Sequence, residues 1–425
     1  MRARFAILLC VAGCDDDAVL AADGDAATAA ADGPTGDLGA DAHAGDCPPP
    51  SLRPTARSEH AGALDVAGEQ LLVFGGTTAV PEMCGFPDPD FTDELWALDE
   101  RCAAWREIEA KGPSARGRHM TAWDAQARRM FVFGGRFRAG GTTYTLHDDL
   151  WAFDAAGEEW TLIDDGGGAG PRARVSGALG YDAEGDALWL FGGDTSQSGA
   201  AYDPQDDTWR FELAKGAWEE IDAGEAEGQP APRLLVAYAF DAARRRLLVF
   251  GGADERAFSF DAEYFGDLWA LDAASPAWVR LAGGADPGGP DGRFFPGLVV
   301  DDASGRIVIF SGHDAGALGN RNDLWTFDDE GGWDELREGD QPNEGSLAFC
   351  EFPANFVAFD LASPERRSAP VFAAGGGRAW VFGGKTDCGA IDDAWKLSFA
   401  SLAWEEAAPA TVGEACVRAE DGDDS

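Results

Sequence analysis

The 425-residue sequence is poor in positive charge. It has 33 Lys plus Arg against 76 Asp plus Glu, a formal net charge of −43, and only four of the basic residues are Lys. Nucleic acids and anionic bilayers are bound by clustered cations, so this balance argues against either as a partner. Histidine and tyrosine are also scarce, at five residues each. There is no C-x-x-C motif and no His at ligand spacing from a Cys, so we expect no metal centre.

The sequence also lacks a long apolar run, so we expect no membrane-spanning helix. The one notable apolar stretch is short: residues 5–13 follow the basic start Met1-Arg-Ala-Arg4 and precede Cys14 and three Asp. Val11-Ala-Gly-Cys14 resembles the lipobox of bacterial lipoproteins, in which cleavage leaves an acylated Cys. This resemblance predicts a lipoprotein signal peptide at 1–13 and lipidation of Cys14; the alternative is an ordinary signal peptide with a Cys there by chance.

On the lipoprotein interpretation, the protein is lipid-anchored in the bacterial cell envelope, at the periplasm or cell surface, and in the outer membrane in preference to the inner one. Residues 14–50 are rich in Ala, Gly and Asp, with nine Asp and no Lys or Arg between 15 and 46. Such a segment buries too little apolar surface to offset its chain entropy, which predicts a disordered acidic tether. Residues 409–425 form an acidic C-terminal tail.

The rest of the chain repeats one pattern six times. An apolar segment ends in Gly-Gly or Ser-Gly, and its last glycine is residue 76, 135, 193, 252, 312 or 384. An acidic residue two positions before a Trp follows each segment, with that Trp at 96, 151, 209, 269, 325 or 395, and a second Trp follows at 105, 160, 218, 278, 333 or 404. A P-x-x-R motif precedes each segment, with its arginine at Arg57, Arg116, Arg174, Arg233, Arg293 or Arg367.

Each repeat predicts four short strands. Most repeats follow one another at intervals close to 59 residues. Four strands at this period predict an all-β, six-bladed β-propeller of four-stranded antiparallel blades at residues 51–408. The Gly-Gly, acidic-x-Trp and second-Trp features resemble the kelch repeat of galactose-oxidase-type β-propellers. Every blade takes its four strands from one repeat, so no strand exchange between the chain ends is needed.

The cysteines are expected to form disulfides, since an exported chain meets oxidising conditions. Beyond Cys10 and Cys14, six candidates remain: Cys47, Cys84, Cys102, Cys350, Cys388 and Cys416. Six cysteines allow 15 pairings. We expect a Cys47–Cys416 bond, because these residues flank the propeller and would lock the ring shut.

The candidate recognition face carries the longer loops, 77–92, 136–147, 194–205, 253–265, 313–321 and 337–364. The six P-x-x-R arginines begin the inner strands at this face and can clamp an anionic ligand at the mouth of the channel. The alternative, which we favour, is that each arginine pairs with the acidic residue before the first Trp of its own repeat. Two related insertions, C-x-F-P followed by a second Phe, place Phe86, Phe91, Phe352 and Phe356 on the same face as a recognition patch, or as packing over the seam.

The histidines and the loop carboxylates offer weaker candidates. A metal site built from His119, His147 and carboxylates lacks the usual ligand spacing. Asp88, Asp90, Asp261 and Glu263 can bind calcium, but they form no complete calcium loop, so solvated acidic loops are the default. We therefore expect no cofactor, with calcium left open.

We expect a noncatalytic, monomeric module that binds a protein or glycan through the long-loop face. The alternative is a sugar-acting enzyme of the kelch group, a mutarotase or an oxidase; a structural spacer is the third reading. The kelch resemblance to galactose oxidase implies copper held by Tyr and His, but the few Tyr and His here show no such constellation. Fold alone does not choose among these functions.

Overall fold

A computed structural model describes residues 47, 52–79, 90–223, 228–259, 261–283, 288–314, 319–342, 356–386 and 389–411. By its contacts the chain divides into two units, Met1–Asp46 and Cys47–Ser425, and the description below concerns the second. The predicted signal peptide, Cys14 and nearly all of the predicted tether and tail therefore lie outside the described residues. The described residues form strands and turns and contain no helix.

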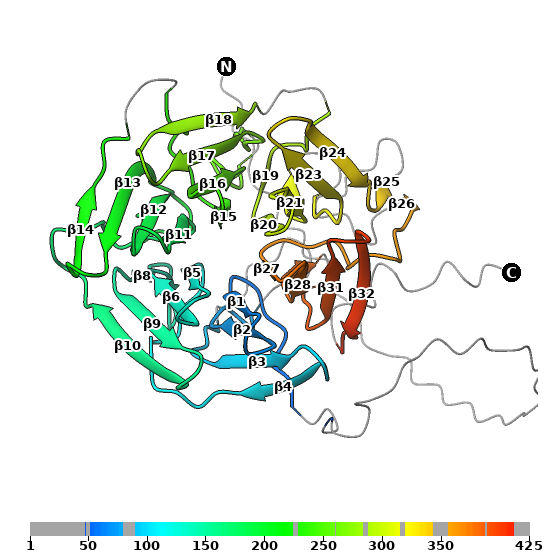
Figure 1. Ribbon diagram of the computed structural model, residues 1–425, viewed down its shortest axis with the longest axis horizontal. Coiled ribbons are helices and arrows are strands. Elements are labelled where there is room, and N and C mark those ends of the chain that lie inside the picture. Colours follow the sequence, from blue (N-terminus) through cyan, green and yellow to red (C-terminus); the bar gives the residue numbers. More distant parts are fainter. Residues whose placement is uncertain are drawn as a thin grey trace, which may run out of the picture. The chain divides into compact units, whose positions relative to one another are not determined.

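Six four-stranded antiparallel sheets form the blades of a β-propeller, as the repeats predict (Figure 1). Blade 1 consists of β1 (Ala61–Asp65), β2 (Gln70–Phe74), β3 (Leu95–Asp99) and β4 (Ala104–Glu107). Blade 2 consists of β5 (Met120–Asp124), β6 (Arg129–Phe133), β9 (Leu150–Asp154) and β10 (Glu159–Asp164). Blade 3 consists of β11 (Ala178–Asp182), β12 (Ala187–Asp194), β13 (Pro204–Glu212) and β14 (Ala217–Glu220).

The second half of the ring repeats this arrangement. Blade 4 consists of β15 (Ala237–Asp241), β16 (Arg246–Phe250), β17 (Leu268–Asp272) and β18 (Trp278–Ala282). Blade 5 consists of β20 (Gly297–Val300), β21 (Ile307–Phe310), β23 (Leu324–Asp328) and β24 (Gly332–Arg337). Blade 6 consists of β27 (Val371–Gly375), β28 (Arg378–Phe382), β31 (Ala394–Ser398) and β32 (Ala403–Ala408). Two-stranded ribbons form the loops: β7 (Arg136–Phe137) with β8 (Thr145–Leu146), β19 (Arg293–Phe294) with β22 (His313–Asp314), β25 (Gln341–Pro342) with β26 (Phe356–Ala358), and β29 (Lys385–Thr386) with β30 (Gly389–Ala390).

The first strand of each blade lies at the centre, and these six strands contact one another in a closed ring that surrounds a channel (Figure 1). The second strand is the most deeply buried; every residue of β2 is buried, for example. A strand in the middle of a blade is covered on both faces by the neighbouring blades. This explains why the segment before each Gly-Gly is apolar throughout instead of alternating.

A Phe–Trp contact recurs at each interface between blades. The second Trp of one blade packs against the Phe that precedes the Gly-Gly of the blade before it, with ring centroids between 4.6 and 5.8 Å apart. The six pairs are Phe74–Trp160, Phe133–Trp218, Phe191–Trp278, Phe250–Trp333, Phe310–Trp404 and Phe382–Trp105. These large rings supply much of the apolar area that holds neighbouring blades together.

The Gly-Gly motif brings the chain close to the next blade. Gly75 and Gly76 have φ values of 68° and 97°, a region that glycine adopts without steric cost. The Gly76 N–H donates a 2.9 Å hydrogen bond to the carbonyl of Arg116 in blade 2. A Cβ on Gly75 would lie only 2.7 Å from that same carbonyl oxygen, so a larger residue would push the blades apart.

The seam between blades 6 and 1 is closed by these same contacts. Trp105 packs on Phe382 at 4.6 Å, and the Gly384 N–H donates to the Arg57 carbonyl. One hydrophobic cluster joins both blades. Each blade takes its four strands from one continuous segment, so the ring closes without strand exchange.

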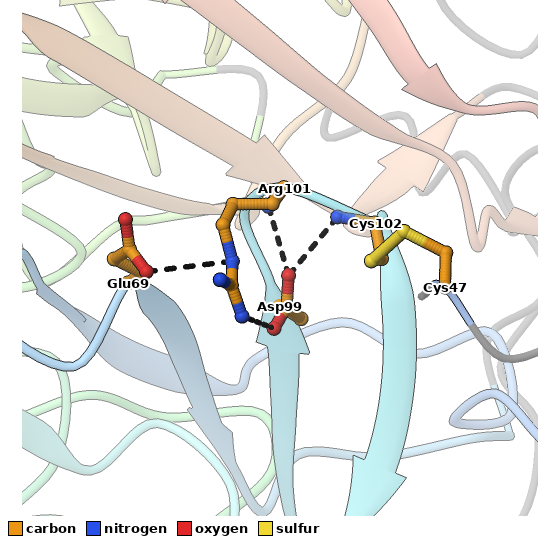
Figure 2. Close-up of a disulfide and its surroundings, with 5 residues drawn as sticks. All are labelled: Cys47, Glu69, Asp99, Arg101 and Cys102. Atoms are coloured by element: carbon orange, nitrogen blue, oxygen red, sulfur yellow. Dashed lines mark hydrogen bonds and ion pairs between the residues drawn. A yellow bond between two sulfur atoms is a disulfide. The ribbon is translucent and has the colours of Figure 1, made fainter. Parts of the chain in front are cut away.

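The expected Cys47–Cys416 disulfide is wrong. Cys47 pairs instead with Cys102, in the turn between β3 and β4 (Figure 2). Asp99 shapes this turn by accepting hydrogen bonds from the backbone N–H groups of Arg101 and Cys102. The bond therefore ties the segment before the propeller to blade 1 and does not span the seam, where the described residues of blades 6 and 1 meet by packing. Cys84, Cys350, Cys388 and Cys416 lie outside the described residues.

If the seam is equivalent to the other interfaces, then Trp105→Ala at the seam and Trp278→Ala within the ring cost similar stability. Both tryptophans are buried, and truncation of a buried Trp costs about 3–5 kcal/mol. Guanidinium unfolding of the two variants measures these costs. A Trp105→Ala variant close to wild-type stability would contradict a packed seam.

Candidate functional site at the channel mouth

The six P-x-x-R arginines lie inside the blades. Their side chains are at most about 1% exposed, and within the described part of the chain none of them lines the channel. Arg174 is representative. Its guanidinium donates to both carboxylate oxygens of Asp207 at 2.5 and 2.8 Å, to the Gly192 carbonyl at 3.0 Å, and to the carbonyl of Arg172 at 3.0 Å.

The ion pair with the acidic residue recurs in every blade, as the favoured alternative predicts. The six pairs are Arg57–Glu94, Arg116–Asp149, Arg174–Asp207, Arg233–Asp267, Arg293–Asp323 and Arg367–Asp393. In each, the carboxylate also accepts the indole N–H of the Trp two residues later. Burial by itself would raise the pKa of Asp207, but the hydrogen bond and charge of Arg174 outweigh it and hold that pKa below its ordinary value. The carboxylate therefore stays charged, and the geometry makes these arginines structural braces.

Other residues occupy the mouth itself, two positions after each arginine. They are Glu59, Arg118, Ser176, Leu235, Phe295 and Ala369; all have a positive φ between 51° and 62°, and all except Leu235 line the channel. Hydrogen bonds link their backbones in sequence from Glu59 to Ala369; for example, the Arg118 N–H donates to the Glu59 carbonyl, and the Ser176 N–H to the Arg118 carbonyl. Our sequence reasoning missed these residues. The signal that would have found them is their fixed offset from P-x-x-R.

Glu59 joins two arginines at the mouth. It accepts from Arg118 at 2.7 Å, and both of its oxygens lie 3.0 Å from Arg136. Burial by itself would raise the pKa of Glu59, but the charges and hydrogen bonds of the two arginines lower it to about 2. Arg118 also reaches from blade 2 to the Phe295 ring of blade 5, with its guanidinium carbon 5.1 Å from the ring centroid. Arg118 thereby crosses the end of the channel at the long-loop face.

Aromatic and arginine side chains gather on the long-loop face of blades 1 to 5. Phe91 contacts Phe137 and Tyr144, and further on Tyr202 contacts Phe258, with ring centroids 5.8 to 6.3 Å apart. Phe258 also contacts Phe294 edge to face, with ring centroids 5.0 Å apart. The guanidinium carbons of Arg136 and Arg138 lie 4.2 and 4.7 Å from the centroid of the Tyr144 ring. We call this set the aromatic crescent: Phe91, Arg136, Phe137, Arg138, Tyr144, Tyr202, Phe258 and Phe294.

Of the four predicted recognition phenylalanines, Phe91 belongs to the aromatic crescent. Phe86 and Phe352 lie outside the described residues, and for Phe356 only the backbone, in β26, is described. Whether the insertions meet across the seam therefore stays a prediction.

The histidines at the inner strands pack between blades. The His60 ring nitrogen lies 3.1 Å from the Phe382 carbonyl, and His119 meets the Phe74 ring edge to face. Burial and, secondarily, a neighbouring arginine lower the pKa of each to about 3, so both are neutral at pH 7. Burial likewise lowers the pKa of His147 to about 4.

No cluster of three or more His, Cys, Asp or Glu suited to a metal ion occurs among the described residues. The calcium candidates have local partners: Asp90 accepts from Thr78, Asp261 accepts from Ser259, and the Glu263 N–H donates to Asp254. Asp88 lies outside the described residues.

Behind the mouth, the channel forms a cavity of about 800 Å³. Residues of all six inner strands line it, and it extends to the short turns at the opposite face. Small and apolar residues such as Gly62, Ala239, Val300 and Ala374, all partly exposed, form part of its wall.

If the arginines are braces, Arg174→Met leaves the partly buried Asp207 without its partner and costs unfolding free energy, up to about 3–5 kcal/mol, the loss for a broken pair that is fully buried. Arg172→Met is a matched control two residues earlier, because Arg172 is 65% exposed and lies 3.7 Å from an exposed Asp203. Such an exposed pair contributes about 1 kcal/mol or less. Denaturant unfolding compares the two, and equal losses would contradict the brace.

Comparisons with known proteins agree with this architecture. The model of the KLHDC2/KLHL20/DRC7 Kelch-repeats domain matches residues 44–235 and 181–350. An N-(sulfonatooxy)prop-2-enimidothioate sulfolyase from Thlaspi arvense is 25% identical over 292 residues, which cover 67% of this chain and 75% of that protein. Kelch domain-containing protein 3 from Bos taurus is 26% identical over 185 residues, 42% of this chain and 44% of the relative. The alignment thus spans less than half the length of kelch domain-containing protein 3. Because the domain model matches well over half of the sequence, the chain belongs to the kelch-repeat family.

Proposed function

We propose that this chain is a noncatalytic protein-binding module that recognises its partner through the aromatic crescent on the long-loop face. The crescent is the observation that carries the proposal. Aromatic residues and arginine are enriched at the energetic centres of protein interfaces. Kelch propellers generally mediate protein interactions, which supports the proposal at the level of the family.

The packing of the crescent suits binding. Its rings hold one another in edge-to-face and tilted contacts, so they lose little conformational freedom when a partner docks. Phe258 is 46% exposed, which leaves apolar area for a partner to bury. Arg138 has no carboxylate partner among the described residues, so its guanidinium is free to bond an acidic group of the partner.

We further propose that the module is held at the bacterial envelope through an acylated Cys14. The lipobox-like Val11-Ala-Gly-Cys14 supports this, and the Cys47–Cys102 disulfide fits an oxidising compartment. In the part of the chain that the structure describes, no helix has the length and hydropathy to cross a bilayer.

If the crescent docks a protein, a photo-crosslinking residue at position 258 of the full chain captures a discrete protein in the native envelope. The same residue at position 162 is the matched control, because Leu162 is 45% exposed but lies on the outer strand β10. With the captured protein purified, Phe258→Ser raises its Kd about 10-fold or more while Leu162→Ser leaves it unchanged.

Equal capture at both positions would contradict a specific docking surface. A product at position 258 that glycosidase removes points to a glycan ligand instead. Turnover of a sugar by the full chain, with no captured partner, would favour the enzymatic alternative.

If Cys14 is lipidated, then Cys14→Ser abolishes incorporation of labelled fatty acid, and an inhibitor of lipoprotein signal peptidase leaves an unprocessed precursor. Cys10→Ser is the control, because Cys10 lies within the predicted signal peptide and is removed with it. Gel mobility and radiolabelling measure both effects. Normal maturation in the presence of the inhibitor contradicts the anchor.

A further inference from the structure

We propose that the central channel binds an anionic amphiphile, a molecule with one carboxylate head and an apolar chain such as a fatty acid. The head would lie beside Arg118 and Ser176, and the chain would follow the channel. This inference goes beyond the protein-binding role, because the acyl chain would lie in the interior of the ring. Of the aromatic crescent, only Arg136 and Arg138 take part, by adding charge at the long-loop end of the channel.

The size and lining of the channel suit an apolar chain. Its volume of about 800 Å³ lies within the range of about 300–1,000 Å³ that is usual for ligand pockets. Partly exposed apolar residues line it, and they come from four different blades: Trp123, Ala239, Val300, Phe372 and Ala374. An acyl chain would bury its surface against these side chains.

Two polar groups at the long-loop end of the channel lack partners. The Arg118 side chain is only 9% exposed, and its Nη1 has no hydrogen-bond partner among the described residues. The Ser176 Oγ is likewise buried without a partner there. Both residues line the channel. Buried donors without partners are costly, so a ligand that accepts hydrogen bonds from them is favoured.

The charge at this end favours an anion. Arg118 and Arg136 share the single carboxylate of Glu59, so the three groups together carry one excess positive charge. Asp194 and Arg138 also lie nearby. With them included, three arginines face two carboxylates, and the excess of one positive charge remains. Burial also raises the pKa of Asp194, which weakens its contribution of negative charge. A carboxylate head is therefore complementary to this site, whereas an ammonium head is not.

The opposite end of the channel is the side of entry that the geometry favours. Arg118 crosses the long-loop end toward Phe295. At the other end the lining includes the small residues Ala67, Ala243 and Gly376, which leave room for a ligand to enter.

Four carboxylates line the entry end, and three of them pair with arginines; the exposed Asp302 instead accepts hydrogen bonds from the backbone N–H groups of Gly376 and Gly377. Asp65 bonds to Arg128 at 2.6 Å and Asp241 to Arg246 at 3.0 Å. An anionic head that enters therefore passes three carboxylates that are paired with arginines, and one, Asp302, that is exposed to solvent and screened by it.

Calorimetric titration of the full chain with dodecanoate below its micelle concentration tests the proposal. We expect one dodecanoate per chain. Dodecan-1-ol, with the same chain and no charge, binds about 10-fold or more weakly, which corresponds to about 1.4 kcal/mol. Butyrate, with the same head and a short chain, shows no measurable binding. Failure of dodecanoate to bind, or equal binding of the alcohol, overturns the proposal.

Variants locate the site. Ser176→Ala removes the unpaired hydroxyl, and the backbone tolerates it because Ala369 occupies the equivalent ring position with φ of 51° against 58° for Ser176. We expect dodecanoate to bind this variant several-fold more weakly. Ala239→Leu narrows the channel and weakens dodecanoate and dodecan-1-ol together.

Arg118→Gln removes the excess charge and should abolish the preference for the acid over the alcohol. If that variant does not fold, the test rests on Ser176→Ala and Ala239→Leu. Dodecanoate affinity that is unchanged in both variants overturns the proposal. Phe258→Ser on the outer face should leave dodecanoate binding intact. Failure of the protein-binding role is thereby distinguishable from failure of the channel site.

Discussion

The arginine of each P-x-x-R motif is the point on which the ring depends, because it joins two blades at once. Its backbone carbonyl accepts the N–H of the second glycine of the preceding blade, as Arg116 does from Gly76. Its guanidinium binds the carboxylate and the glycine carbonyl of its own blade, as Arg116 does with Asp149 and Gly134. A buried ion pair is worth little against an apolar substitute, but breaking one is costly. Each arginine therefore holds the geometry at both levels: the strands within a blade, and the spacing between blades.

This use of the arginines leaves the side chains at the mouth free to differ. The six residues two positions later share one backbone conformation and are linked in sequence by backbone hydrogen bonds, yet they include an acid, a base, a hydroxyl and three apolar side chains. A nearly six-fold frame thus presents an asymmetric surface. The charge of Arg118, shared with Glu59, and the rings of the aromatic crescent give that surface its chemistry. A regular scaffold with variable loops and rim residues is how one fold serves different ligands.

At the seam, the described residues of the first and last blades pack as they do at the other interfaces. The last blade meets the first through the same Phe–Trp contact and glycine hydrogen bond as the other interfaces. Arg378 adds an ion pair to Glu100 across it. With every interface satisfied in this way, a disulfide between the ends is not required. The Cys47–Cys102 bond instead ties the entering chain to the outer part of blade 1, which restrains the segment that leads into the ring.

The sequence by itself determined the blade count, the four strands of each blade, the antiparallel order and the ion pairs of the arginines. Each depends on local patterns that recur six times, and six occurrences distinguish a short motif from a chance match. It did not determine the partner of Cys47, because cysteine order along the chain does not say which thiols lie within bonding distance. Nor did it reveal Glu59, Arg118 and Arg136 as one cluster, or the reach of Arg118 to Phe295. These residues come from different strands and blades, and only ring closure brings them together around a shared channel.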